Sequence, residues 1–128
     1  MSQCDNAREL GESFSAFLAE GDWGGIRKLL TEDATWTLPG DNLISGTAQG
    51  VDEVMERAQK IASYGVDFEL LHILVSRENM ALSLHNTAQR GETRLDEYLS
   101  VVCRLRDGRI ASIETYLSDV AGMNAFFV

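Results

Sequence analysis

The chain has 128 residues, of which 20 are acidic and 11 are basic, so its formal net charge at pH 7 is −9. A basic face that neutralises phosphates is therefore not expected, which argues against a nucleic-acid partner. No apolar run reaches the roughly 18 residues of a transmembrane helix, and the polar N-terminus lacks the apolar core of a secretion signal. We expect one globular domain over residues 1–128, located in the cytoplasm and without a membrane partner.

The cysteines and histidines give no sign of a metal or redox centre. Cys4 and Cys103 are far apart in the sequence, and we expect both as free thiols in a reducing compartment. His72 and His85 have no third ligand at a spacing typical of zinc sites. We therefore expect no metal and no cofactor.

Hydrophobic periodicity predicts three helices in the first half of the chain. Leu10, Phe14, Phe17 and Leu18 form one apolar stripe on a helix from about residue 5 to residue 20. Asp22 is expected to cap a second, short helix that ends near residue 30. A third helix is predicted from residue 51 to about residue 64, where a glycine follows it.

An irregular crossing is predicted between the second and third helices. A strand that begins near Ala34 must end at Pro39, the only proline of the chain, because proline fixes its own φ and favours an extended conformation in Leu38. Gly40, Gly46 and Gly50 then permit backbone turns that other residues resist.

After residue 65 the pattern becomes that of strands. Four segments rich in β-forming residues are predicted at about 66–76, 80–90, 94–106 and 109–118, with turns at Gly91-Glu92 and Asp107-Gly108. Three helices and a strongly antiparallel sheet indicate an α+β domain, with the helices covering one face of the sheet.

The second hairpin can be aligned by separating apolar from polar side chains. A two-residue loop would pair Val101 with Glu114 and so mix the two kinds on one face. A three-residue loop over residues 106–108 pairs Leu99 with Thr115 and Val101 with Ile113, and it separates the faces. The second alignment is therefore predicted.

The first hairpin, with Gly91-Glu92 as a two-residue turn, pairs apolar residues with apolar residues. This alignment places Asn86 beside Glu97 on the concave, helix-covered face. A slip by one residue would instead place His85 and Asp96 there, and we keep this slipped alignment as an alternative.

The predicted concave face is mostly hydrocarbon with a few polar groups, which is typical of a small-molecule site. Glu97 is the candidate general acid or base, because burial raises the pKa of a carboxyl group, and Asn86 would orient it. The alternative is that Glu97 lies at the rim of the sheet and meets water or Arg94. Contacts to a hydrophobic ligand are expected from Phe17, Trp36, Leu38, Leu84, Leu99, Val101 and Thr115.

The opposite, convex face is predicted to carry aromatic and polar side chains. His85, Tyr98 and Tyr116 should lie in a row there, with Ser100 and Glu114 beside them. Such a mixture is typical of a recognition surface, and we expect a homodimer through this face.

The order of these motifs resembles the SnoaL-like polyketide cyclases, a group with the ketosteroid-isomerase-like or nuclear-transport-factor-like fold. The first half is similar in Gly21-Asp22, residues 36–40, Ser45-Gly46 and Gly50. The second half is similar in Ala88, Arg90-Gly91, Leu95-Asp96, Arg104, residues 107–110, Tyr116 and Asp119. The resemblance implies a cone-shaped, curved antiparallel sheet wrapped around three N-terminal helices, commonly dimeric through the sheet.

The acids that the resemblance implies are missing from this chain. Neutral residues stand at the positions where members of the group carry their catalytic carboxylates, namely Leu38, Ser100 or Val101, and Thr115. This argues against aldol cyclisation, steroid isomerisation and epoxide hydrolysis by the familiar arrangements. It leaves a rearranged site that uses Glu97, or a pocket that binds its ligand without acid–base chemistry.

Two functions follow for this chain, and a third is weaker. The first is a cofactor-independent enzyme that isomerises or cyclises a hydrophobic small molecule, polyketide-like or terpenoid-like, in secondary metabolism. The second is a small-molecule-binding protein without chemistry, which the missing acids suggest. The third is an accessory domain that acts only through oligomerisation.

Overall fold

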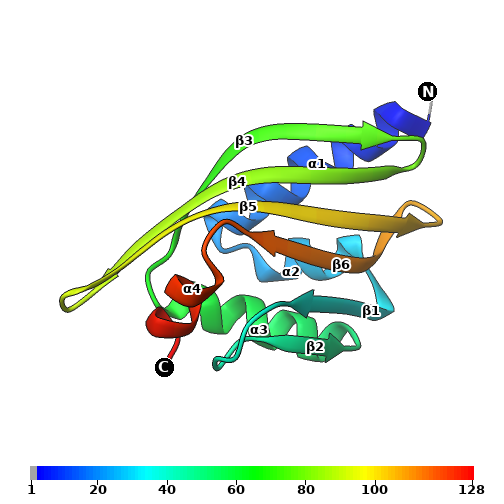
Figure 1. Cartoon of the computed structure of the whole chain (residues 1–128). Helices are drawn as coiled ribbons and strands as arrows, with labels where there is room; N and C mark the ends of the chain where they lie inside the picture. The colour runs from blue at the N-terminus through cyan, green and yellow to red at the C-terminus, as the bar shows by residue number, and fades with distance from the viewer. Residues whose placement is uncertain (1–2) are drawn as a thin grey trace.

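The computed structural model of the chain describes residues 3–128. In this part of the chain, helices and strands follow one another in the order α1 (Gln3–Glu20), α2 (Trp23–Leu29), β1 (Leu30–Leu38), β2 (Gly46–Gln49), α3 (Val51–Ser63), β3 (Asp67–Ser76), β4 (Asn79–Arg90), β5 (Thr93–Arg106), β6 (Arg109–Leu117) and α4 (Val120–Phe126) (Figure 1). None of the helices in residues 3–128 is long and apolar enough to cross a membrane.

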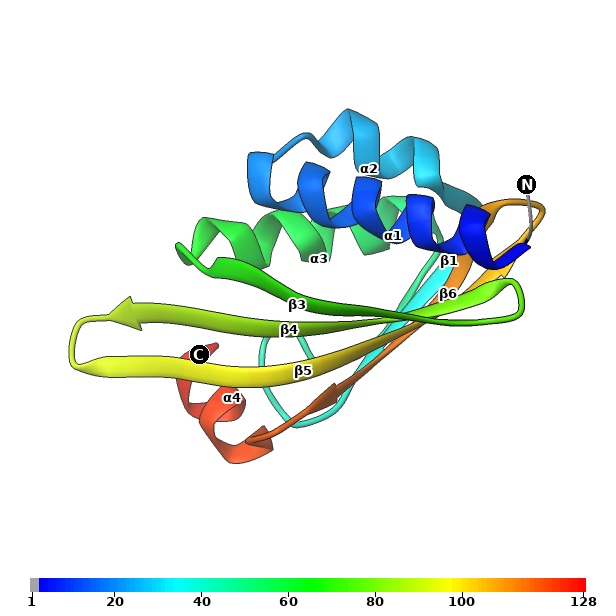
Figure 2. The same ribbon diagram turned by 90° about the horizontal axis from the view of Figure 1, so that it is seen from above.

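The strands form one curved sheet in the order β2-β1-β6-β5-β4-β3. Strand β1 runs parallel to β6, and the other neighbours pair antiparallel. Figure 2 shows α1, α2 and α3 together along one side of the sheet, whereas α4 lies apart from them beside β5. The expected α+β cone is confirmed, with one parallel pairing that the sequence did not indicate.

The predicted helix ends agree with the structure because local capping sets them. Asp22 accepts a hydrogen bond from the Gly25 N–H at 3.0 Å and so caps α2. Helix α3 ends at Ser63, just before Gly65, whose φ of 76° suits the left-handed turn that follows many helices.

Apolar side chains fill the space between the helices and the concave face of the sheet. One cluster joins α1 and α2 to the middle strands, and it includes Phe14, Ile26, Leu82, Cys103 and Ile110, all largely or fully buried. A second cluster at the open end of the cone joins α3, β1 and α4. Removing these groups from water is the main favourable contribution to folding.

The crossing between α2 and α3 is more regular than expected. After a turn held by hydrogen bonds between Asn42 and Ser45, the chain forms β2, which pairs with residues 35–38 of β1. A four-residue edge strand that begins at a glycine has too little alternation to be seen in the sequence.

The predicted alignment of β5 and β6 is wrong by two residues. Val101 lies opposite Thr115, and Leu99 lies opposite Leu117. The loop has only two residues, Asp107 and Gly108, both with positive φ, as tight hairpin turns require. A bulge between residues 104 and 105 then restores the separation of apolar and polar faces.

Candidate functional site

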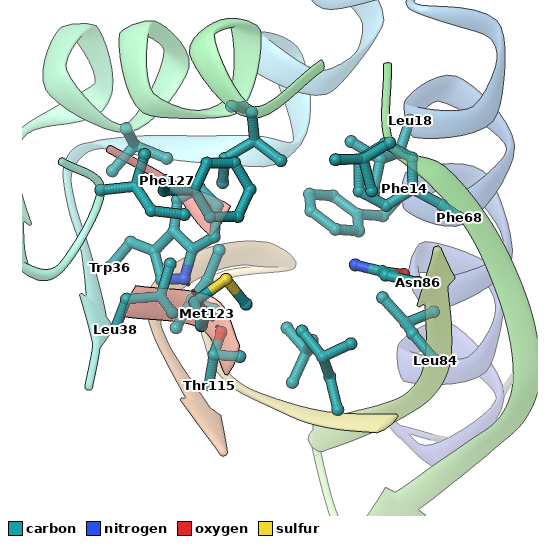
Figure 3. Close-up of a pocket in the computed structure, with 18 of the residues that line it drawn as sticks. Phe14, Leu18, Trp36, Leu38, Phe68, Leu84, Asn86, Thr115, Met123 and Phe127 are labelled. Carbon is teal, nitrogen blue, oxygen red and sulfur yellow. Dashed lines mark hydrogen bonds between the residues drawn. The ribbon is translucent and has the colours of Figure 1, made fainter. Parts of the chain in front are cut away.

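An apolar cavity with a volume of about 70 Å³ lies between the helices and the concave face. Its walls come from α1, α3, β1, β4, β5, β6 and the α4 segment. Among the described residues that line it, none has an ionisable side chain, and the polar ones are Asn86, Thr115 and the indole of Trp36. Figure 3 shows these side chains around the open space.

The structure brings most of the predicted contact residues together around this cavity. Those that line it are Trp36, Leu38, Leu84, Asn86, Leu99, Val101 and Thr115. Phe17 does not line it, because its ring packs toward α2, where a Cβ on Gly25 would lie 2.9 Å from it. Phe14, on the adjacent helical stripe with Leu18, faces the cavity in its place.

Asn86 projects from β4 into the cavity with no protein partner for its amide oxygen. Its residue is 6 % exposed, and Oδ1 makes no hydrogen bond with the described residues. A buried amide oxygen without a hydrogen-bond partner costs free energy, so this position is not explained by folding alone. Figure 3 shows the amide nitrogen of Asn86 directed toward the open space.

Trp36 and Thr115 form the second polar position, on the other side of the cavity (Figure 3). The Trp36 indole Nε1–H donates to Thr115 Oγ1 at 2.9 Å, and Thr115 is 2 % exposed. Arg57 holds Trp36 in place through two contacts. Its guanidinium lies 5.2 Å from the centroid of the indole ring, and it donates a hydrogen bond to the Trp36 carbonyl oxygen at 2.8 Å.

Glu97 is the buried carboxylate nearest to this site, but it does not line the cavity. It lies opposite Asn86 in the β4–β5 ladder, as the predicted alignment requires, and it is 1 % exposed. Its Oε1 accepts a hydrogen bond from the Asp119 N–H at 3.0 Å, and Oε2 lies close to Gly122. The start of α4 thus separates Glu97 from the ligand space.

Burial raises the pKa of the Glu97 carboxyl above its ordinary value. The hydrogen bond from the Asp119 N–H opposes this shift, and the negative charge of the Asp119 side chain adds to it. Glu97 is therefore a protonatable group beside the site whose pKa is raised by burial.

Helix α4 and the residues around it close the cavity. Met123 and Phe127 contribute to its lining. Asp119 caps the helix by accepting from the Gly122 N–H at 2.9 Å. Asn124 Oδ1 accepts from the Asp41 N–H at 2.8 Å and so ties the helix to the loop before β2. The sequence did not indicate this covering role.

No metal centre is formed in the part of the chain that the structure describes, because nowhere there do three potential ligands among His, Cys, Asp and Glu gather. Cys103 is a buried free thiol whose pKa burial raises to about 12, so it stays protonated at neutral pH.

The buried carboxyl makes folding stability depend on pH in a predictable direction. Because the folded-state pKa of Glu97 is above its ordinary value of 4.5, its contribution to stability is present below that value and is lost as the pH rises through the raised pKa. Glu97→Gln keeps the acceptor for Asp119 without the charge. We expect the free energy of unfolding of the wild type, relative to this variant, to fall as the pH rises above about 4.5.

Urea denaturation at several pH values measures this difference. Glu20→Gln, at the exposed end of α1, is the control, and it should keep the pH dependence of the wild type. A difference between wild type and Glu97→Gln that stays constant with pH would contradict a buried, perturbed carboxyl group at this position.

Comparison with known proteins places this arrangement in a family. A model described as a SnoaL-like domain matches residues 12–113. The structure of Bal32a, from a soil-derived mobile gene cassette, is similar with a TM-score of 0.94 and 25% identity, over 98% of this chain and 99% of that one. No curated protein matches the chain in sequence.

Two further solved structures share the fold at lower identity. TerC co-crystallised with polyporic acid is similar with a TM-score of 0.81 and 16% identity, over 94% of this chain and 98% of that one. An LEH-like epoxide hydrolase from M. tuberculosis is similar with a TM-score of 0.71 and 19% identity, over 97% of this chain and 90% of that one. Because the family model matches most of the chain and the solved structures have the same cone-shaped fold, this protein belongs to the SnoaL-like family.

Proposed function

We propose that this protein binds a hydrophobic small molecule inside the cavity under α4. The observation that carries the proposal is the lining itself, which is apolar except for Asn86 and the Trp36–Thr115 pair. Apolar cavities with a few polar groups are the usual form of small-molecule sites. A ligand would fill space that is otherwise costly to keep, and it could accept a hydrogen bond from the Asn86 amide nitrogen, which faces the open space.

The second candidate function is chemistry on that ligand, as a cofactor-independent enzyme that isomerises or cyclises a polyketide-like or terpenoid-like molecule in secondary metabolism. The observation that favours it is the buried Glu97 with its raised pKa, directly opposite Asn86. Glu97 could exchange a proton with the ligand only if α4 moved, because the start of this helix separates the two. The cavity would otherwise act by orienting a flexible substrate, which alone accelerates reactions strongly.

Two structural relatives are described as binding or acting on small molecules, which supports a small-molecule site in this chain. TerC was co-crystallised with polyporic acid, and another structural relative is an LEH-like epoxide hydrolase. Both share the fold with this chain, and they support the binding proposal without identifying its ligand.

The binding proposal predicts that filling the cavity abolishes ligand retention. Ala58 lines the cavity on α3, and Ala58→Phe would place a ring in the ligand space. We expect native mass spectrometry to detect a small molecule that co-purifies with the wild type and is absent from this variant. Ala19→Phe, on the exposed side of α1, is the matched control and should retain the molecule. Equal retention by wild type and Ala58→Phe would contradict binding in this cavity.

The second candidate function, catalysis on the bound ligand, predicts that Glu97→Gln loses turnover. When the co-purified molecule is incubated with the protein, we expect the variant to convert it about 100-fold more slowly, with little change in affinity, since only the proton transfer is removed. Glu114→Gln should convert it at the wild-type rate. Conversion by Glu97→Gln at the wild-type rate would remove Glu97 from the mechanism, and recovery of the molecule unchanged would favour binding alone.

We also propose that two copies of the chain associate through the convex face of the sheet. Tyr98 and Tyr116 are 55 % and 58 % exposed there. The His85 ring stacks on Tyr98 with centroids 4.3 Å apart, and His85 Nε2 lies 2.6 Å from an Asp96 carboxylate oxygen. A surface of exposed aromatic side chains held in place by stacking and hydrogen bonding favours a self-complementary, two-fold interface.

Light scattering tests the dimer. We expect a mass about twice the 14.1 kDa of the chain at micromolar concentration, and a monomer for Tyr116→Asp, because a charge would be buried in the interface. Gln59→Asp, an equal change in charge on exposed α3, should remain dimeric. A wild-type mass near that of one chain would contradict the proposal.

A further inference from the structure

The two polar positions of the cavity are far apart along the sheet. Asn86 lies on β4 and Thr115 on β6, with β5 between them. Asn86 lies opposite Glu97, whereas Thr115 lies opposite Val101, four residues further along β5. Two strand spacings of about 4.8 Å and four steps of about 3.3 Å put the Cα atoms about 16 Å apart on a flat sheet.

Both positions offer a hydrogen-bond donor to the cavity. Thr115 Oγ1 already accepts from the Trp36 indole, so its own O–H remains to be donated, and no acceptor for it is found among the described residues. The Asn86 amide nitrogen, which is a donor, points into the open space (Figure 3). A matching ligand therefore needs an acceptor at each end.

The rest of the lining restricts the body and the charge of the ligand. Between the two donors the walls are hydrocarbon and aromatic, including Phe14 and Phe127. None of the described residues that line the cavity is ionisable, so a charged ligand would be buried without an opposite charge, which is costly.

We infer that the ligand is a neutral, elongated ring compound with an acceptor oxygen, a hydroxyl or a carbonyl, at each end. One oxygen accepts from the Asn86 amide and the other from the Thr115 hydroxyl, and the rings lie between them. This inference rests on the proposed binding function and narrows its ligand class.

Two rigid probes of nearly equal size test it. In 4,4′-dihydroxybiphenyl an oxygen stands at each end of two rings, and in 4,4′-dimethylbiphenyl methyl groups replace both oxygens. We expect Asn86→Leu and Thr115→Val each to weaken the binding of the dihydroxy probe about tenfold in calorimetric titrations, as the loss of one hydrogen bond implies, and to leave the dimethyl probe unaffected.

Controls separate lost hydrogen bonds from lost folding. Thr115→Ser keeps the hydroxyl and should retain the affinity of the wild type, as should Tyr98→Phe on the convex face. Circular dichroism confirms that each variant is folded before it is titrated.

The outcomes distinguish this inference from the proposal on which it rests. If the variants weaken both probes equally, or neither, the two-ended ligand is wrong, but the cavity still binds hydrophobic molecules. If the wild type binds neither probe, the proposed binding function fails, and the inference fails with it.

Discussion

The hydrogen bond from the Asp119 N–H to buried Glu97 holds the site together. It fixes the start of α4 on β5, and α4 in turn supplies Met123 and Phe127 to the cavity. A carboxylate at this depth is costly, and the raised pKa of Glu97 is the sign of that cost. The buried carboxyl group is also the group that joins α4 to the sheet, so its protonation state and the position of the helix are coupled.

The same bond decides which groups a bound molecule meets. Because Glu97 faces α4, the cavity presents neutral donors instead of an acid. Binding then depends on apolar contact and on Asn86 and Thr115, whereas acid–base chemistry requires α4 to open first. Small-molecule binding is therefore the function that the closed structure supports most directly, and catalysis is a second function that a mobile α4 would add.

The sequence predicted the elements that local rules determine and missed those that depend on distant contacts. The β4–β5 alignment followed from a two-residue turn and alternating side chains, so the neighbours Asn86 and Glu97 were found. The β5–β6 alignment failed because a bulge leaves no trace in the alternation. Phe17 was expected at the ligand because it shares an apolar stripe with Phe14, and only the packing of α2 through Gly25 shows that it turns away. The position of α4 over Glu97 depends on contacts across the fold, which no local pattern reveals.

The most direct test of the account is a two-dimensional ¹⁵N–¹H spectrum of the two tryptophan indoles, recorded while 4,4′-dihydroxybiphenyl is added. Trp36 lines the cavity and donates to Thr115, whereas Trp23 lies outside the lining at the start of α2. The account predicts that the Trp36 indole N–H signal, assigned with Trp36→Phe, shifts to saturation while the Trp23 signal stays in place. A shift of Trp23 alone, or no shift of either, would contradict a ligand site in this cavity.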